Sequence, residues 1–448
     1  MKNICRKLQP WLGKKADALW HAYLTAETSD SKREAEALIQ LLGAQYLRTT
    51  AGHEPILLPP PSAAEAAGEF LVGTILYGER PLHPLFLRRE NFIKHIGIFS
   101  ITGGGKTNAA QVLLLGLLAK NIPFLVLDWK RSYHRLRSLP IPGVERIKVF
   151  AVGRRSESGF NWNPLRGPPN VHPKTWISVV AEALEKSHIS GPGVADIFIE
   201  LFDKKFDQFG FYDGVPSQYP NFFDVSEELD RVQFRGRRML WQDSCSRILK
   251  TFTFGPASGA FNARHPLKLE EVLSEPVILE LDQELPKPLR VFLSDLLLRW
   301  IHLYRLGQGE TNALRHVTVL EEVHNLFPRT QVEKQTTNSL ENVFREIRSF
   351  GEGLVTITQH PSAIPIYVLG NCNTQIYLGL QHEEDIRTAR RALFLAPEDE
   401  GFLDRLAVGQ GIVKIKGRTA PCLVTFPLVP VQPEDEGDNL RKEGGSHD

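Results

Sequence analysis

The segment from His95 to Asn108, HIGIFSITGGGKTN, constrains the chain more than any other stretch. An apolar run that predicts a strand passes into a glycine-rich turn, and the turn ends in Lys-Thr at the start of an apolar run that predicts a helix. Glycine adopts backbone conformations that other residues resist, so successive N–H groups can converge on phosphate oxygens at the positive end of the helix. This pattern predicts a P-loop that binds a nucleoside triphosphate.

The residue types of the P-loop suggest roles for its positions. Lys106 is expected to reach the outer phosphates and Thr107 to hold magnesium. The usual pattern G-x-x-x-x-G-K-[ST] begins with glycine, whereas this chain has Ser100 there. Because short glycine runs before Lys-Thr also arise by chance, the assignment depends on the flanking strand and helix. The remaining expected nucleotide-binding residues are Thr102, Gly103, Gly104, Gly105 and Asn108.

Bulk composition narrows the possible classes of protein. The 448 residues include 53 Lys and Arg against 52 Asp and Glu, so net charge neither requires nor excludes nucleic acid. The four cysteines are dispersed without C-x-x-C spacing, which argues against a disulfide framework or a zinc cluster and fits a reducing cytoplasm. The longest strongly apolar run, Val112–Ala119, is far shorter than the ~20 residues that cross a bilayer. We therefore expect a cytoplasmic protein without a membrane anchor of its own.

Residues 1–65 are expected to form a small helical accessory region. Lys14–Leu24 predicts one helix, and a capping box at Ser31-x-x-Glu34 predicts a second helix over Ala35–Leu47. The proline and small-residue stretch that follows, residues 59–68, predicts a breaker or linker.

Residues 66–430 are expected to form the core, because strands alternate with helices from residue 91 onward, which is typical of an α/β fold with a mostly parallel sheet between helices. A segment rich in Pro, Gly and Phe at about 159–271 predicts a helical insertion. Residues 431–448 are charged without apolar periodicity and are expected to be disordered. The predicted strands are Phe70–Tyr77, Ile96–Ser100, Phe124–Asp128, Ile147–Val152, Val277–Leu281, Val317–Leu320, Leu354–Ile357, Thr374–Leu380, Gly411–Lys416 and Cys422–Thr425, and the predicted core helices are Lys106–Lys120, Leu289–Leu306, Asn338–Phe350 and Glu383–Leu393.

Two carboxylates follow the predicted strand Val317–Leu320. A P-loop on a parallel sheet needs an acid at the end of a neighbouring strand, because magnesium on the phosphates must be held and a water must be activated. Glu321 is the expected magnesium-side acid, and Glu322 is the expected base that orients the attacking water. The alternative is that both glutamates only solvate a strand end; the P-loop favours the catalytic interpretation.

The segment LVTITQ predicts a strand that ends in an amide, Gln359, which could sense the γ-phosphate and contact the attacking water. Upstream, Arg345 and Arg348 are three positions apart on one face of a predicted helix. In a ring of subunits such a face can present an arginine to a neighbour's phosphate. The alternative is a salt-bridged surface face with Glu341 and Glu346.

Several stretches of the chain resemble the HerA-like branch of the HerA/FtsK family of ATP-driven DNA-pumping motors, over about residues 70–430. The resemblance implies a RecA-like core, ATP hydrolysis with Mg2+, a homohexameric ring and passage of DNA through a central channel. It also implies that Lys94, Arg345 and Arg348 match positions where family members carry basic residues near the subunit interface. The stretches are the P-loop with the preceding Lys94-His95, Leu127-Asp128, residues 321–324, residues 344–380 and residues 409–424.

The chain departs from the family pattern at Ser100, at Glu321 where Asp is normal, and at His360 where Arg is common. Because Glu is one methylene longer than Asp, the water shell of the magnesium would shift, with slower turnover as one consequence. Archaeal members carry a β-barrel before the motor, whereas this chain is expected to be helical there. That difference bears on whether the same nuclease partner docks.

Three classes of function remain open. The first, which we favour, is a DNA-translocating ATPase that acts alone or with a nuclease or other effector. The second is the ATP-binding scaffold of an antiviral defence complex, and the third is a conjugation or secretion ATPase. A dense basic cluster in the insertion is either a DNA or partner surface or, as we favour, a solvated helix face; it comprises Arg231, Arg235, Arg237 and Arg238 with Phe234 and Trp241.

Overall fold

The computed structural model describes residues 1–47, 55–153, 159–191, 193–214, 216, 218–255, 257–327, 339–418 and 420–431. They form two compact units: unit 1 consists mainly of residues 1–113 and 354–427, and unit 2 mainly of residues 114–326 and 339–353. Helix α6 (Lys106–Ala119) and strand β8 (Phe350–Thr358) have residues in both units. The predicted charged tail lies outside the described residues from position 432 onward.

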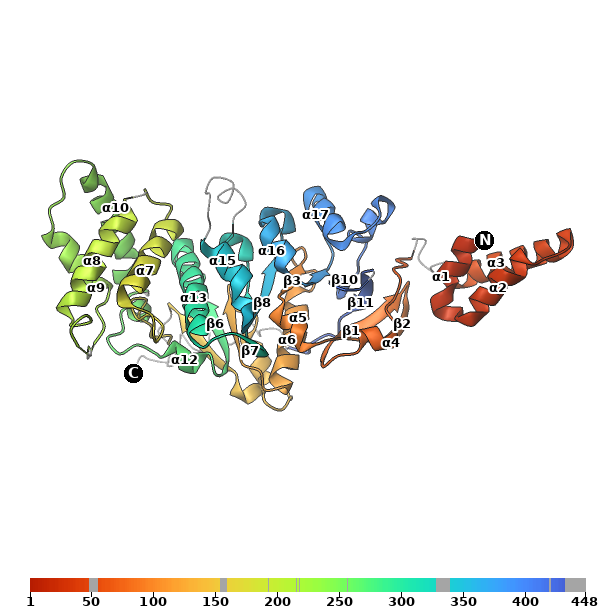
Figure 1. Ribbon diagram of the computed structural model, residues 1–448, viewed down its shortest axis with the longest axis horizontal. Helices are drawn as coiled ribbons and strands as arrows, with labels where there is room; N and C mark the ends of the chain where they lie inside the picture. The colour runs from red at the N-terminus through yellow and green to blue at the C-terminus, as the bar shows by residue number, and fades with distance from the viewer. Residues whose placement is uncertain are drawn as a thin grey trace, which may run out of the picture. The chain divides into compact units, whose positions relative to one another are not determined.

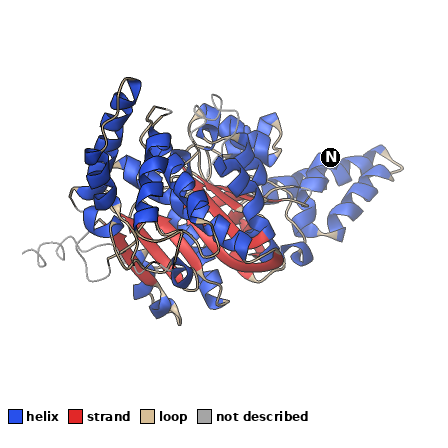
Figure 2. Cartoon of the chain, turned by 60° about the vertical axis from the view of Figure 1, so that its left-hand side comes forward, coloured by secondary structure: helices blue, strands red, loops and turns tan. Residues whose placement is uncertain are grey.

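The chain begins with three helices, and residues 1–47 contain no strand (Figure 2). Helix α2 has the predicted bounds, but α3 begins earlier than the capping box at Ser31 predicted. Thr28 Oγ1 accepts a hydrogen bond from the Ser31 backbone N–H and Ser31 Oγ accepts one from the Thr28 N–H, both at 3.2 Å. The predicted cap is therefore wrong, because Thr28 already satisfies the first turn. The helices are α1 (Lys2–Leu12), α2 (Lys14–Leu24) and α3 (Ser29–Leu47).

The predicted linker contains a short helix, α4 (Ala63–Ala66), instead of irregular chain alone. The Glu65 N–H donates to Ser62 Oγ at 3.3 Å, and Glu65 Oε2 accepts from the Ser62 N–H at 2.8 Å. This reciprocal capping box stabilises a single turn among small residues.

Aromatic contacts connect the N-terminal helices to the first strands of unit 1. Tyr77 at the end of β1 packs edge-on against Trp11, with ring centroids 5.0 Å apart, and its hydroxyl donates to the Lys7 carbonyl at 2.7 Å. The Arg80 guanidinium lies 4.8 Å from the ring centre of Tyr46. These contacts hold α1 and α3 against the β1–β2 turn.

In unit 1 the strands lie in the order β2-β1-β11-β10-β9-β3-β8. Strand β3 is parallel to β8 and β9, whereas the strands from β9 to β2 pair antiparallel. Strand β2 was not predicted, since Pro81 and Pro84 interrupt its pattern; both are tolerated because β2 is last in the order. The other elements are β1 (Phe70–Tyr77), β2 (Arg80–Leu87), α5 (Arg89–Ile93), β3 (Ile96–Phe99), α16 (Ile366–Asn371), β9 (Thr374–Tyr377), α17 (Glu383–Leu393), β10 (Gln410–Ile415), β11 (Cys422–Thr425) and the 3-10 turns Pro361–Ala363 and Pro397–Phe402.

In unit 2 the strands lie in the order β7-β4-β6-β5, and all three pairs are parallel. Figure 1 labels two of these strands, β6 and β7. Parallel buried strands between helices confirm the predicted α/β core. The predicted helix over Asn338–Phe350 is shorter, because α15 ends at Glu346 and a 3-10 turn follows. The elements are β4 (Phe124–Asp128), β5 (Lys148–Val152), α7 (Pro173–Ser187), α8 (Val194–Gln208), α9 (Phe222–Arg231), α10 (Arg237–Thr253), α11 (Ala257–Phe261), α12 (Leu269–Val272), β6 (Pro276–Leu281), α13 (Lys287–Gly307), β7 (Thr311–Leu320), α15 (Ser339–Glu346) and the 3-10 turns His134–Ser138, Val144–Arg146, Val323–Asn325 and Ile347–Ser349.

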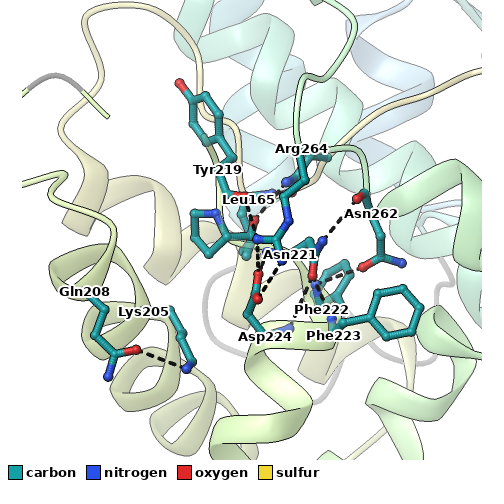
Figure 3. Close-up of polar contacts among 12 residues, drawn as sticks. Leu165, Lys205, Gln208, Tyr219, Asn221, Phe222, Phe223, Asp224, Asn262 and Arg264 are labelled. Atoms are coloured by element: carbon teal, nitrogen blue, oxygen red, sulfur yellow. Dashed lines mark hydrogen bonds and ion pairs between the residues drawn. The ribbon is translucent and has the colours of Figure 1, made fainter. Parts of the chain in front are cut away.

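The segment predicted as an insertion contains α7 to α12, and polar contacts fix the start of α9 (Figure 3). Asn221 Oδ1 accepts hydrogen bonds from the N–H groups of Phe223 and Asp224, at 3.0 and 3.2 Å. The Arg264 guanidinium donates hydrogen bonds to both carboxylate oxygens of Asp224, at 2.5 and 2.8 Å. A bidentate pair at a helix N-terminus orients the helix firmly.

Among the described helices, none combines the length and the apolar character needed to cross a bilayer.

Candidate nucleotide site

The P-loop, residues 100–107, leaves the buried strand β3 and enters α6 in unit 1. Gly103 and Gly105 have φ of +78° and +103°, where side-chain-bearing residues are strained, so these glycines are required by the backbone. At Gly104 the reason is space, since an added Cβ would lie 2.1 Å from Ser100 Oγ. Ser100, the departure from the usual pattern, is fully buried, and its Oγ donates to the Gly379 carbonyl at 3.3 Å.

Lys106 folds back over its own loop. Its Nζ donates to the carbonyls of Ser100 and Ile101 at 2.8 and 2.6 Å. These bonds place the ammonium inside the curve of the P-loop, where an incoming phosphate would compete for it. Thr107 follows half-buried in the first turn of α6, and Asn108 Nδ2 donates to the Pro427 carbonyl at 2.9 Å.

The structure brings Gln359 to the P-loop, as the strand pattern predicts for a residue at the same edge of the sheet. Strands β3 and β8 pair in parallel with Phe99 opposite Thr358, so both strands end together. Thr102 Oγ1 then donates to Gln359 Oε1 at 2.7 Å. The next residue, His360, contacts the Asp385 carboxylate at 3.0 Å.

In unit 2 the acidic cluster consists of Asp128, Glu321 and Glu322. Glu321, at the end of β7, is buried and accepts hydrogen bonds from the Tyr133 hydroxyl at 3.0 Å and the Trp129 N–H at 3.2 Å. Burial and the neighbouring charge of Asp128 raise the pKa of Glu321 to about 8. The raised pKa favours the protonated form of Glu321 when no cation is nearby.

Asp128, at the end of β4, organises the turn that follows it. Its carboxylate accepts hydrogen bonds from the N–H groups of Lys130, Ser132 and Tyr133, at 3.0, 2.7 and 3.1 Å. Burial nevertheless raises its pKa, and the charge of Glu280 adds to the effect. These three hydrogen bonds stabilise the backbone conformation of residues 128–133.

Glu322 has a left-handed backbone, with φ 46° and ψ 43°, and its side chain is 12% exposed. Lys130 Nζ lies 2.5 Å from Glu322 Oε1, and His324 Nδ1 lies 3.4 Å from Oε2. A left-handed glutamate directly after a buried strand is uncommon and marks a constrained position.

Lys130, Tyr133 and Glu280 have no role predicted from the sequence, and Asp128 was named only as part of the family resemblance. Glu280 contacts Arg131 Nε at 3.3 Å and His134 Nδ1 at 2.9 Å. Burial alone would raise its pKa, but the His134 contact and the Arg131 charge lower it. The sequence feature that could have identified these residues is the charged run after Asp128. It lies at the carboxyl end of a parallel strand, where α/β proteins commonly bind their ligands.

Lys94 precedes β3 and so lies at the opposite strand end from the P-loop, about 13 Å away for a four-residue strand. Its Nζ is 3.8 Å from Glu90. Arg345 pairs with Glu341 at 2.5 Å, as the surface-face alternative expected, and Glu346 lies 3.5 Å from His302. Lys94 lies in unit 1, whereas Arg345 in α15 and Arg348 in the 3-10 turn that follows belong to unit 2.

Two of the four arginines in the basic cluster of the insertion form ion pairs. Arg231 pairs with Glu227, and Arg238 lies 2.7 Å from Glu200. The Arg237 guanidinium stacks 5.5 Å from the ring centre of Trp241. These contacts support the interpretation as a solvated helix face.

A family model described as the central domain of the helicase HerA matches residues 70–183. A probable DNA double-strand break repair helicase HerA of Methanocaldococcus jannaschii is 22% identical over 374 residues, covering 74% of this chain and 71% of that protein. A probable helicase of the same organism, MJECL08, is 23% identical over 360 residues, covering 75% of this chain and 66% of that protein.

Solved structures with a similar fold include VirB4 of Thermoanaerobacter pseudethanolicus, with a TM-score of 0.60, 16% identity and coverage of 81% of this chain and 97% of that one. The plasmid coupling protein TrwB, solved with ADP and Mg2+, has a TM-score of 0.59 and 11% identity and covers 85% of this chain and 96% of that one. These two likenesses show a RecA-like P-loop fold. The HerA matches show that the chain is similar in sequence to HerA helicases.

Proposed function

We propose that the chain is an ATP-driven DNA translocase that works as a homohexameric ring. The observation that supports it most is the link between Thr102 of the P-loop and Gln359, because it couples the phosphate-binding backbone to a polar group able to sense the γ-phosphate. The HerA-like sequence adds the expectation that hydrolysis drives movement of DNA through a central channel.

In this proposal each site residue has one role. Lys106 binds the outer phosphates, and Thr107 and Glu321 hold Mg2+. Glu322 orients the attacking water and accepts its proton, and Gln359 contacts the same water. The other proposed P-loop contacts come from Thr102, Gly103, Gly104, Gly105 and Asn108.

The donor set suits magnesium. A hydroxyl and a carboxyl are hard oxygen ligands, and the raised pKa of Glu321 means that a cation would replace a proton on that side chain. Among the described residues no group of three or more His, Cys, Asp or Glu side chains forms a metal site, so water and phosphate oxygens would supply the remaining ligands. When bound, Mg2+ would supply charge neutralisation on the phosphates.

A neighbouring subunit would complete the site. We propose that Arg345 or Arg348 reaches the phosphate of an adjacent protomer, with Lys94 on the same interface. Arg345 is exposed and pairs with Glu341 within its helix, an ion pair weak enough to exchange for a phosphate. The N-terminal helices α1 to α3 are the proposed docking region for a nuclease or defence effector.

The test is ATP hydrolysis with and without DNA, together with particle mass. The parent protein should hydrolyse ATP faster with DNA and should have the mass of six chains. Lys106→Ala should abolish nucleotide-dependent activity, and Glu322→Gln should bind ATP without turnover. Retained hydrolysis in both variants would reject the assigned roles, and a DNA-independent rate would reject translocation.

The runner-up is an ATPase of a conjugation or secretion apparatus, which the fold likeness to TrwB and VirB4 favours. A scaffold subunit of a defence complex is the third possibility, favoured by the helical N-terminal region. Recruitment to membranes by a partner would support the conjugation function, and ATP binding without DNA stimulation would support the scaffold.

A further inference from the structure

We propose that Lys130 is a positioning residue that holds the Glu322 carboxylate in an ion pair in the nucleotide-free chain and releases it during turnover. The inference rests on the proposed function, which makes Glu322 the base. Lys130 Nζ lies 2.5 Å from Glu322 Oε1, a short contact between opposite charges. Neither the sequence motif nor the family resemblance gave Lys130 a role.

Glu322 is the fixed partner of this pair. Its side chain is 12% exposed, and its backbone is left-handed, a conformation that persists only where the surrounding structure enforces it. Glu321 and the buried end of β7 precede it and a 3-10 turn follows, so the main chain that carries the carboxylate is held in place.

Lys130 is the partner that can move. Its backbone is anchored, because its N–H donates to Asp128 Oδ1 within the turn that Asp128 organises. Its side chain is 41% exposed and carries the ammonium on a flexible four-carbon stem. The ammonium can therefore swing from Glu322 to another anion without any change of the main chain.

Differences in charge between the Glu322 carboxylate and a nucleoside triphosphate determine which of them the Lys130 ammonium pairs with. A carboxylate that already accepts a hydrogen bond from an ammonium is a weaker acceptor for the proton of a water. A nucleoside triphosphate is a strongly negative competitor for the same ammonium. We expect the ion pair to suppress hydrolysis by the resting site and to loosen when the phosphates are fully engaged.

The prediction is a gain of basal activity. Lys130→Gln should raise kcat for ATP measured without DNA by about two- to fivefold, the range for loss of a partly exposed ion pair. KM should rise slightly, because the ammonium is no longer available to the phosphates, and the ratio of DNA-stimulated to basal rate should fall. Lys130→Arg keeps the charge and should restore most of the parent ratio.

The same turn provides a matched control. Arg131→Gln removes one positive charge from the adjacent position, but Arg131 Nε contacts Glu280, at 3.3 Å, and has no assigned catalytic role. Its basal rate should match the parent. The double variant Lys130→Gln/Glu322→Gln should be inactive if the gained activity passes through Glu322, and thermal unfolding of each variant shows whether it folds.

A Lys130→Gln rate that is unchanged or lower, in a folded protein, would overturn the inference, as would an equal rise in Arg131→Gln. These results differ from a failure of the proposed function. Turnover by Glu322→Gln alone would remove Glu322 as the base, and a parent protein without ATP hydrolysis would remove the motor. If Lys130→Gln does not fold, Lys130→Met takes its place and must show the same rise in kcat.

Discussion

The Thr102 hydroxyl donates a 2.7 Å hydrogen bond to the Gln359 side chain, across 257 positions of sequence. Thr102 lies in the P-loop and Gln359 at the end of β8, so one bond joins the phosphate-binding loop to the amide that follows the neighbouring strand. Parallel pairing of β3 with β8 makes the contact possible, because both strands end at one edge.

Thr102→Val should lower kcat for ATP by about two- to tenfold, the range for one neutral hydrogen bond, with a smaller effect on KM. Valine keeps the shape of the side chain but leaves Gln359 without its donor from the loop. Thr102→Ser retains the hydroxyl and serves as the control in the same steady-state assay. Equal losses in both variants would show that the methyl group, not the hydrogen bond, matters.

Glu321→Gln should stabilise the nucleotide-free protein at high pH. The pKa of Glu321 is raised to about 8, so the folded state favours the protonated form, and its stability contribution is lost as pH rises from about 4.3 to 8. Glutamine mimics the protonated form, so the free energies of unfolding should agree near pH 4 and differ by on the order of 5 kcal/mol above pH 8.

Urea unfolding from pH 4 to 9 measures this difference. Glu275→Gln is the matched control, because Glu275 is 40% exposed and lies in the same unit. Its curve should follow the parent. If the free energy of unfolding of Glu321→Gln differed from the parent value by the same amount at every pH, the assignment of a proton to buried Glu321 would be wrong.

Glu352→Gln should destabilise the fold by about 3 kcal/mol at pH 7, because it breaks a buried charged network. Glu352 is fully buried and accepts hydrogen bonds from His316 Nδ1 and Thr318 Oγ1, both at 2.7 Å, and from Arg305 Nε at 3.0 Å. Burial would raise its pKa, but the His316 charge, with Arg305 and Thr318, lowers the pKa to about 2.

The pH dependence of Glu352 has the opposite sign to that of Glu321. Its stabilisation is present above about pH 4.3 and is lost as pH falls toward 2, so Glu352→Gln should flatten the acid limb of the unfolding curve. Thr318→Val, which removes only a neutral donor, should cost about 1 kcal/mol. An equal cost in the two variants would show that the charge of Glu352 is unimportant.

Gly104→Ala should weaken ATP binding about tenfold, because the new Cβ would lie 2.1 Å from Ser100 Oγ and force the P-loop apart. Removing that hydroxyl should relieve the clash, so Ser100→Gly/Gly104→Ala should recover most of the affinity in a nucleotide titration. Ser100→Gly alone is the control. Additive losses in the double variant would mean that Ser100 and Gly104 are not in contact.

Local sequence pattern was sufficient for much of the fold. Strands β1, β4 and β11 and helices α2 and α17 have the predicted bounds, because apolar periodicity and breakers act over a few residues. The helix start predicted at Ser31 was wrong because Thr28, three positions earlier, provides the cap. Strand β2 was not predicted because its place at the edge of the sheet permits prolines that the pattern excluded. The division into an accessory region, a core with an insertion and a tail stays a prediction.

The candidate site, like the fold, has features that the local sequence predicted and features that it did not. The sequence determined the P-loop, since its glycines and Lys-Thr fix a local backbone, and it placed Glu321, Glu322 and Gln359 at strand ends. Three relationships depend on the folded chain: Thr102 donates to Gln359, Glu321 is buried beside Asp128, and Lys130 pairs with Glu322. Each of these relationships joins segments more than a hundred positions apart, and burial and charge pairing arise only when parallel strands bring such segments to a common edge.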